Sequence, residues 1–412
     1  MRLNPASAGP ALLLTGATGL IGHHLLLELL TRGHAVMVLV RPDRQKTGLE
    51  RVSAQLSEVL SVEEVVSLLQ TRLTVLEGDI TLPRLGLNQT DWQWMCKRVS
   101  HVIHAAALLQ FMPDQAEAVR RNIREGTQQV YRVAQEAGLP HFFWFSTAYV
   151  GGKLADPRHP PTEVWREVPH PRPLGFQNAY EEAKHTLERL LREWDDASGI
   201  RSTLFRPSCV VGTYETGRTL NFQTLYGFID LMDQERRRLL RHGPSAPEHT
   251  RLVYFSELLP GATRNVVPVD YVARASAEII LTPALHGGIY HLTHPTPPDR
   301  WQANRWMAHA LGFAELIRPS EVEAHRALGH VLTEFQPGRL ARFSTVFRGY
   351  LLEHEPRFDV QRAQAALLPR GIVCPPADEA FFRRVVGYCL QTRWRTRALD
   401  KTSREVCDVR YA

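Results

Sequence analysis

Two side chains four positions apart in the sequence have the types and spacing of a proton donor and its electrostatic partner. Tyr180 and Lys184 belong to the segment YEEAK, and a helix would place both on one face. A phenol with its ordinary pKa of about 10 is a poor acid at neutral pH, but an adjacent ammonium lowers that pKa. The spacing therefore indicates general acid chemistry, with Tyr180 as the acid and Lys184 as its partner.

Two hydroxyl residues, Ser146 and Thr147, follow the apolar segment 141–145. A hydroxyl at the end of a buried strand can donate to a carbonyl oxygen and to the negative charge that develops on it. From the residues alone, either Ser146 or Thr147 fits this task. Asn122, within the segment 115–137 of helical spacing, is a further candidate that would order a water or the backbone. A polar residue satisfied within its own helix is an equal alternative for Asn122.

A glycine-rich loop follows the first apolar segment, 11–15, and opens a segment with helical spacing at 20–32. Its spacing is G-x-x-G-x-x-G. The first glycine permits a tight turn, the second lets the backbone approach a pyrophosphate, and the third allows close packing. The helix N-terminus faces the phosphates. The sequence therefore predicts a dinucleotide site at Gly16, Thr18, Gly19, Leu20, Ile21 and Gly22.

The cofactor's ribose is expected to lie beside the end of the second apolar segment, 35–40. An NAD site normally carries an acid here to bind the 2′-hydroxyl, whereas this chain has Arg41, with Arg44 and Lys46 close by. Guanidinium groups suit a 2′-phosphate. The sequence therefore predicts NADPH as the cofactor, and a solvated loop arginine is the alternative interpretation of Arg41.

Two further segments are expected to border the cofactor. Asp79 and Ile80 follow the third apolar segment, 73–76, where the carboxylate would accept a hydrogen bond from the adenine amino group. Asp79 equally fits a turn cap. Ala105 and Ala106 follow the fourth apolar segment, 102–104, and their small side chains would let the cofactor lie against the backbone.

These candidate residues stand at the ends of short apolar segments that alternate with longer amphipathic ones. This alternation predicts an α/β fold, a Rossmann-type doubly wound parallel sheet. Further elements are expected at 179–194 (helix) and 202–205 (strand). Beyond about residue 213 the alternation fails, so we expect an NADP-binding domain at 1–290, with a substrate-domain insertion at about 213–265. A smaller, mainly helical substrate-binding region is expected at 291–412.

Composition excludes several function classes. The 412 residues are 44% hydrophobic with a net charge of +6, too mild a surplus for a dedicated nucleic-acid binder. The most apolar stretch, 11–30, contains glycines, histidines and a glutamate, so no membrane span is predicted. Five scattered cysteines and a terminus unlike a signal peptide favour a cytoplasmic protein. No metal site is expected.

The motifs together resemble the extended short-chain dehydrogenase/reductase family over roughly residues 10–290. The segments LTGATGLIG, LVRP, EGDI, VIHAAA, FSTAYVGG, YEEAK and VPVDYVA are most similar to its thioester reductase and fatty acyl-CoA reductase branch, which has a male-sterility-type NAD(P)-binding domain. The resemblance implies that Thr147 is the hydroxyl of a triad with Tyr180 and Lys184. It also makes Asn122 the helix asparagine and places Pro207 and Ser208 at the nicotinamide amide.

The resemblance implies that an acyl thioester, bound to coenzyme A or to a carrier protein, is reduced to an aldehyde or alcohol. No carrier domain is evident in the sequence, so a carrier-bound substrate is expected to arrive on another chain. The alternatives are a ketone or aldehyde reductase, a sugar-nucleotide epimerase or dehydratase, and a non-catalytic NADP-sensing protein. The proline-rich insertion between Thr147 and Tyr180 is expected to border the substrate pocket.

Overall fold

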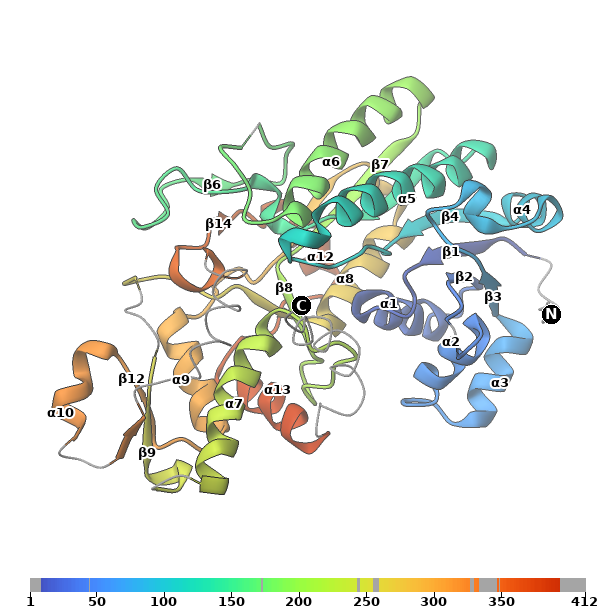
Figure 1. Ribbon diagram of the computed structural model, residues 1–412. Coiled ribbons are helices and arrows are strands. Elements are labelled where there is room, and N and C mark those ends of the chain that lie inside the picture. The colour runs from blue at the N-terminus through green and yellow to red at the C-terminus, as the bar shows by residue number, and fades with distance from the viewer. Residues whose placement is uncertain are drawn as a thin grey trace.

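A seven-stranded parallel sheet forms the centre of the computed structural model (Figure 1), which describes residues 9–43, 45–171, 173–242, 245–254, 259–326, 330–332, 347 and 349–392. Its strand order is β3-β2-β1-β4-β5-β7-β11. The strands are β1 (Ala11–Thr15), β2 (Val36–Val40), β3 (Leu73–Glu77), β4 (Val99–His104), β5 (His141–Phe145), β7 (Arg201–Pro207) and β11 (Ile289–Leu292).

Helices cover both faces of this sheet, as Figure 1 shows for α1 and α8 on one side and α5 and α6 on the other. Side chains that alternate along each strand enter separate cores, so that Leu12 and Leu14 face one layer and Leu13 the other. Strands buried on both faces are apolar throughout. The first layer contains α1 (Leu20–Thr31), α2 (Gly48–Leu56), α3 (Val62–Thr71), α8 (Val269–Leu281) and α12 (Gln361–Leu367); the second contains α4 (Gln89–Cys96), α5 (Ala116–Glu136) and α6 (Ala179–Ser198). The predicted doubly wound fold is confirmed.

The order of the strands reverses direction between the neighbouring strands β1 and β4. The chain runs outward from β1 through β2 to β3, and in the opposite direction from β4 through β5 to β7. The loops that leave β1 and β4 therefore diverge and open a crevice at the carboxyl ends of the strands. The glycine loop at 16–19 and the alanines at 105–107 both lie at this edge.

A second hydrophobic core lies beside the sheet, at the lower left of Figure 1. It joins segments that are far apart in the sequence, since α7 (Leu225–His242) and β9 (Thr250–Val253) pack with α9 (Arg300–Ala310), β12 (Glu315–Ile317) and α13 (Glu379–Gln391). Short parallel strands accompany the helices: β8 (Cys209–Val211) pairs with β10 (Val266–Pro268), β13 (His330–Leu332) with β9, and β6 (Val164–Trp165) with β14 (Arg357–Phe358). The short helix α10 (Val322–Arg326) follows β12 in the sequence. The predicted domain boundaries stay a prediction.

The proline-rich insertion has a structural task that the sequence did not indicate. None of its described residues between 152 and 178 lines the main cavity, but Gln177 and Asn178 donate hydrogen bonds to the cavity-lining Glu181 and Tyr350. Glu167 instead accepts hydrogen bonds from the backbone N–H groups of His291 (2.8 Å) and Ala363 (3.1 Å). The buried Arg206 donates to the carbonyl of Val168 at 3.0 Å. The insertion thus fastens the returning C-terminal segment to the sheet.

Candidate active site

A cavity of about 290 Å³ opens at the carboxyl edge of the sheet and continues toward the second core. Gly19 and Gly22 line it at the N-terminus of α1, and Tyr180 lines it at the N-terminus of α6. Residues of the second hydrophobic core, such as Phe228 and Leu351, line the other side of the cavity. Groups from both halves of the chain therefore meet around one space, which is the usual form of a ligand site.

The glycine loop has the geometry that its spacing predicts. Gly16 has a φ of +80°, and a Cβ added there would lie 2.6 Å from the backbone nitrogen of Ala106. A Cβ at Gly22 would lie 2.1 Å from the carbonyl oxygen of Gly16. Larger residues at these two positions would clash with backbone, whereas Gly19 is exposed at the helix N-terminus. The loop thus leaves backbone N–H groups open to an anion.

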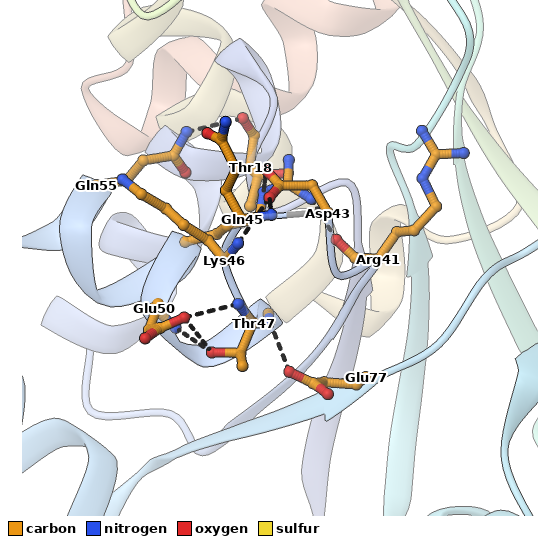
Figure 2. Close-up of polar contacts among 11 residues, drawn as sticks. Thr18, Arg41, Asp43, Gln45, Lys46, Thr47, Glu50, Gln55 and Glu77 are labelled. Atoms are coloured by element: carbon orange, nitrogen blue, oxygen red, sulfur yellow. Dashed lines mark hydrogen bonds and ion pairs between the residues drawn. The ribbon is translucent and has the colours of Figure 1, made fainter.

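The end of β2 carries an arginine that is open to solvent. The Arg41 side chain is 69% exposed, and its Nη1 lies 3.7 Å from Oδ2 of Asp79. Figure 2 shows the Arg41 guanidinium pointing away from the cluster formed by Thr18, Asp43 and Gln55. Gln55 donates to the carbonyl of Thr18 at 3.0 Å, which ties α2 to the glycine loop. Arg44 lies outside the described residues.

A second arginine, Arg51, stands beside Arg41 and was not identified from the sequence. It donates to the carbonyl oxygen of Arg41, and its Nη2 lies 3.5 Å from Oγ1 of Thr18. The start of α2 sets this position, because Thr47 and Glu50 form a reciprocal cap (Figure 2). The pattern T-x-x-E at Thr47 was the available signal, since it marks a helix whose first turns contain Arg51.

The other predicted cofactor neighbours hold the crevice together. Asp79 Oδ1 accepts from the backbone N–H and hydroxyl of Thr81 at 2.9 and 2.8 Å, which is the turn cap that the sequence left open. Ile80 packs against Gly126, and a Cβ added to Gly126 would lie 2.8 Å from Cδ1 of Ile80. Ala105 lines the cavity, and Ala106 lies against Gly16.

Tyr180 and Lys184 lie on one face of α6, as their spacing predicts, and both line the cavity. Lys184 Nζ is 5.6 Å from the centre of the Tyr180 ring and donates to the carbonyl of Phe145 at 2.6 Å. Burial lowers the pKa of Lys184 to about 7. Burial, together with the carboxylate of Glu181, raises the pKa of Tyr180. The expectation that the ammonium lowers the phenol's pKa is thus wrong, because burial and the neighbouring carboxylate both raise that pKa. The phenol keeps its proton at neutral pH.

The two adjacent hydroxyls have different partners. Ser146 Oγ donates to Oε1 of Glu188 at 2.6 Å, and Glu188 is itself bound by Arg206 Nε at 2.9 Å. Thr147 Oγ1 accepts from the backbone N–H of Tyr149 at 3.3 Å, and Thr147 lines the cavity. That contact leaves the hydroxyl hydrogen of Thr147 available to a ligand.

The remaining predicted residues border the same space. Asn122 accepts a hydrogen bond from the backbone N–H of Leu108 at 3.0 Å, so it holds the loop that follows β4. Pro207 and Ser208 line the cavity, and no described group hydrogen-bonds the buried hydroxyl of Ser208. Within the described part of the chain no group of three or more His, Cys, Asp or Glu side chains is placed to hold a metal, and no helix is long and apolar enough to cross a membrane.

Comparisons with known proteins agree with this geometry. The family model described as Male sterility protein matches residues 14–276. An isonitrile lipopeptide synthase of Streptomyces coeruleorubidus is 30% identical over 52% of this chain, and a carboxylic acid reductase of Segniliparus rugosus is 27% identical over 50%. The chain spans only 14% and 18% of the lengths of these two proteins.

A solved structure has the same fold over nearly the whole chain. The terminal R domain from the myxalamid PKS-NRPS biosynthetic pathway has a TM-score of 0.73 and 22% identity, and the match covers 96% of each chain. The glycine-loop crevice, the Tyr180 and Lys184 pair and the matched family model lead to one conclusion. The chain belongs to the Male sterility protein family, a family of NAD(P)-binding reductase domains of the extended short-chain dehydrogenase/reductase type.

Proposed function

We propose that this protein uses NADPH to reduce an acyl thioester to an aldehyde, with reduction onward to the alcohol as the second stage. The main support for this proposal is that the glycine loop and the side chains of Thr147, Tyr180 and Lys184 line one cavity. The named relatives support the substrate class, since reductase domains of such synthetases and carboxylic acid reductases reduce thioester-bound acyl groups.

The residues present suit a bound dinucleotide. A Cβ would fill the cradle at Gly16 and Gly22, and the unpartnered Ser208 hydroxyl lies along the same cavity. Arg41 and Arg51 favour the 2′-phosphate of NADPH over the 2′-hydroxyl of NADH, because bidentate guanidinium contacts suit phosphate. When bound, the nicotinamide supplies the hydride. The other proposed contacts are Thr18, Leu20, Ile21, Asp79, Ile80, Ala105, Ala106 and Pro207, with Asn122 as a positioning residue.

The proposed roles of the protein groups follow the charge that develops on the substrate oxygen. The hydroxyls of Thr147 and Tyr180 donate to the thioester carbonyl oxygen and stabilise negative charge there. As the carbonyl carbon is reduced, Tyr180 gives its proton to that oxygen, and a hemithioacetal results. The carbon–sulfur bond then breaks, the thiol leaves with a proton and an aldehyde remains. Lys184, beside the phenol, stabilises the phenolate that Tyr180 becomes.

The thioester is proposed to reach the site on coenzyme A or on a carrier protein, as the synthetase relatives suggest. The direct test is NADPH oxidation by the full chain with a panel of acyl-CoA, acyl-carrier and aldehyde substrates. Turnover of thioesters, with aldehyde or alcohol as product, is expected. Turnover of ketones or aldehydes alone would instead support the simpler carbonyl reductase. NADPH binding with no turnover across the panel would support the sensing protein.

A further inference from the structure

The substrate side of the cavity contains a buried cation that the proposed chemistry does not use. Arg264 precedes β10, is 8% exposed and lines the cavity. Its Nη2 donates to Oδ1 of Asn304 at 3.0 Å, and its Cζ lies 5.7 Å from the centre of the Phe228 ring. Its Nε is buried and has no hydrogen-bond partner among the described residues. Most of its five N–H donors are therefore unused.

The nearest acid does not neutralise this guanidinium by contact. Glu355 also lines the cavity, and its carboxylate accepts from the backbone N–H of Asn265 at 2.6 Å and from the hydroxyl of Tyr149 at 3.4 Å. Neither Arg264 nor the fully buried Arg300 comes within 4.0 Å of a carboxylate in the described part of the chain. Arg264 and Glu355 thus line the same space without a direct ion pair between them.

An unpaired charge in such a place is costly unless something binds it. Removing a cation from water without a close hydrogen-bonding or charged partner is unfavourable. Apolar side chains line the same space, among them Leu225, Phe228, Val266 and Leu351, together with the polar Asn221, Gln223 and Thr224. A purely hydrocarbon acyl chain would desolvate Arg264 further and offer it nothing. An acyl chain with an oxygen acceptor would satisfy it.

We propose that Arg264 is a specificity-determining residue that selects acyl groups carrying a carbonyl or carboxylate oxygen remote from the thioester. The proposal rests on the proposed function for the identity of the site, but it concerns binding alone. The apolar side chains around Arg264 accommodate the methylene chain, and the guanidinium binds the oxygen. An oxygen placed at the right distance is expected to improve affinity about tenfold, as for a hydrogen bond to a charged group.

The test is equilibrium binding to the full chain loaded with NADP⁺, which cannot reduce the ligand. The ligands are pantetheine thioesters, since coenzyme A and carrier proteins share pantetheine. The acyl chain is varied over three lengths, and at each length it ends in a methyl, a ketone or a carboxylate group. We expect at least one oxygen-bearing ligand to bind about tenfold tighter than its methyl counterpart. The ketone and carboxylate arms identify which oxygen is preferred. Equal affinities, or no binding of any ligand, would overturn the proposal.

Three variants assign the preference to this side chain. Arg264→Met is expected to abolish the oxygen preference, and methyl-terminated ligands should bind at least as tightly because they no longer desolvate a guanidinium. Arg264→Lys keeps the charge but lacks the forked donors, so a smaller preference is expected, and this variant decides the matter if Arg264→Met does not fold. Arg300→Lys is the matched control, because Arg300 does not line the cavity; it should retain the preference. A preference unchanged in both Arg264 variants would refute the assignment. Binding is measured without turnover. The oxygen preference can therefore be determined even if the protein does not reduce thioesters.

Discussion

The hydroxyl of Ser146 donates to the carboxylate of Glu188 at 2.6 Å, and this carboxylate also forms a buried ion pair with Arg206. Both residues line the cavity, but the hydroxyl of the neighbouring Thr147 donates to no acceptor among the described residues. Two adjacent residues with the same chemical group therefore have different tasks. The hydroxyl hydrogen of Ser146 is bound by Glu188, so Thr147 is the hydroxyl that we propose as the donor to a substrate carbonyl.

Thr147→Val is expected to lower kcat about 100-fold with little change in stability, because it removes one donor to the developing oxyanion. Ser146→Ala is the matched control. It leaves Glu188 with one donor fewer and should lower the free energy of unfolding by about 1–3 kcal/mol while turnover is retained. Steady-state kinetics and urea unfolding check both. Loss of turnover in Ser146→Ala alone would reverse the assignment.

Tyr180→Phe is expected to bind NADPH as the parent chain does and to lose turnover by about 100-fold or more. The substitution removes the proton donor and keeps the ring that packs edge-on against Phe111 at 6.0 Å. Stopped-flow measurement of hydride transfer, together with NADPH titration by fluorescence, separates the two effects. Turnover at the parent rate would show that another group donates the proton.

Cofactor preference is expected to depend on both Arg41 and Arg51. Arg41→Asp should favour NADH, because a carboxylate repels the 2′-phosphate and accepts from the 2′-hydroxyl. Arg51→Ala should weaken NADPH binding about tenfold and leave NADH binding unchanged. The ratio of kcat/KM for the two cofactors measures the effect. Arg189→Ala, on the exposed side of α6, is the control that should leave the ratio unaltered. A constant ratio in the Arg41 and Arg51 variants would argue against a 2′-phosphate site here.

Glu181 is expected to make stability depend on pH. Burial raises the pKa of its carboxyl to about 7, although Tyr350 and the backbone N–H of Gln177 both donate to it. The folded state therefore holds its proton more tightly than the unfolded chain. This stabilisation is complete below the unfolded pKa of 4.5 and is lost as pH rises through about 7.

Glu181→Gln should remove this part of the pH dependence, which amounts to about 3 kcal/mol at most. The amide can still donate to the Tyr350 hydroxyl, so the packing is retained. The measurement is the free energy of unfolding in urea at several pH values between the two limits. If the parent chain and Glu181→Gln lose stability in parallel over that interval, the carboxyl of Glu181 is not the group responsible.

Much of the fold could be predicted from the sequence because the patterns that indicate its strands, helices and turns are local. Buried parallel strands read as continuous apolar runs, and the glycine loop needs only its neighbours to form a tight turn. The pair Tyr180 and Lys184 is likewise a property of one helix. The helix α7 was missed because its run Arg236–Arg238 obscures the apolar face; these arginines pair with acids of the same helix, Asp233 among them.

The sequence by itself thus determined the sheet, the glycine loop and the placement of Tyr180 and Lys184 on one helix face, all of which depend on residues close together in the chain. From the residues alone Ser146 and Thr147 were equal candidates, and only the resemblance implied Thr147. Only the tertiary structure shows which hydroxyl already has an acceptor, since Glu188 lies 42 residues away from Ser146. The same holds for Arg51 at the glycine loop and for Arg264 on the cavity wall. Burial, hydrogen-bond partners and net charge at a site arise from packing between distant segments, and no local spacing encodes them.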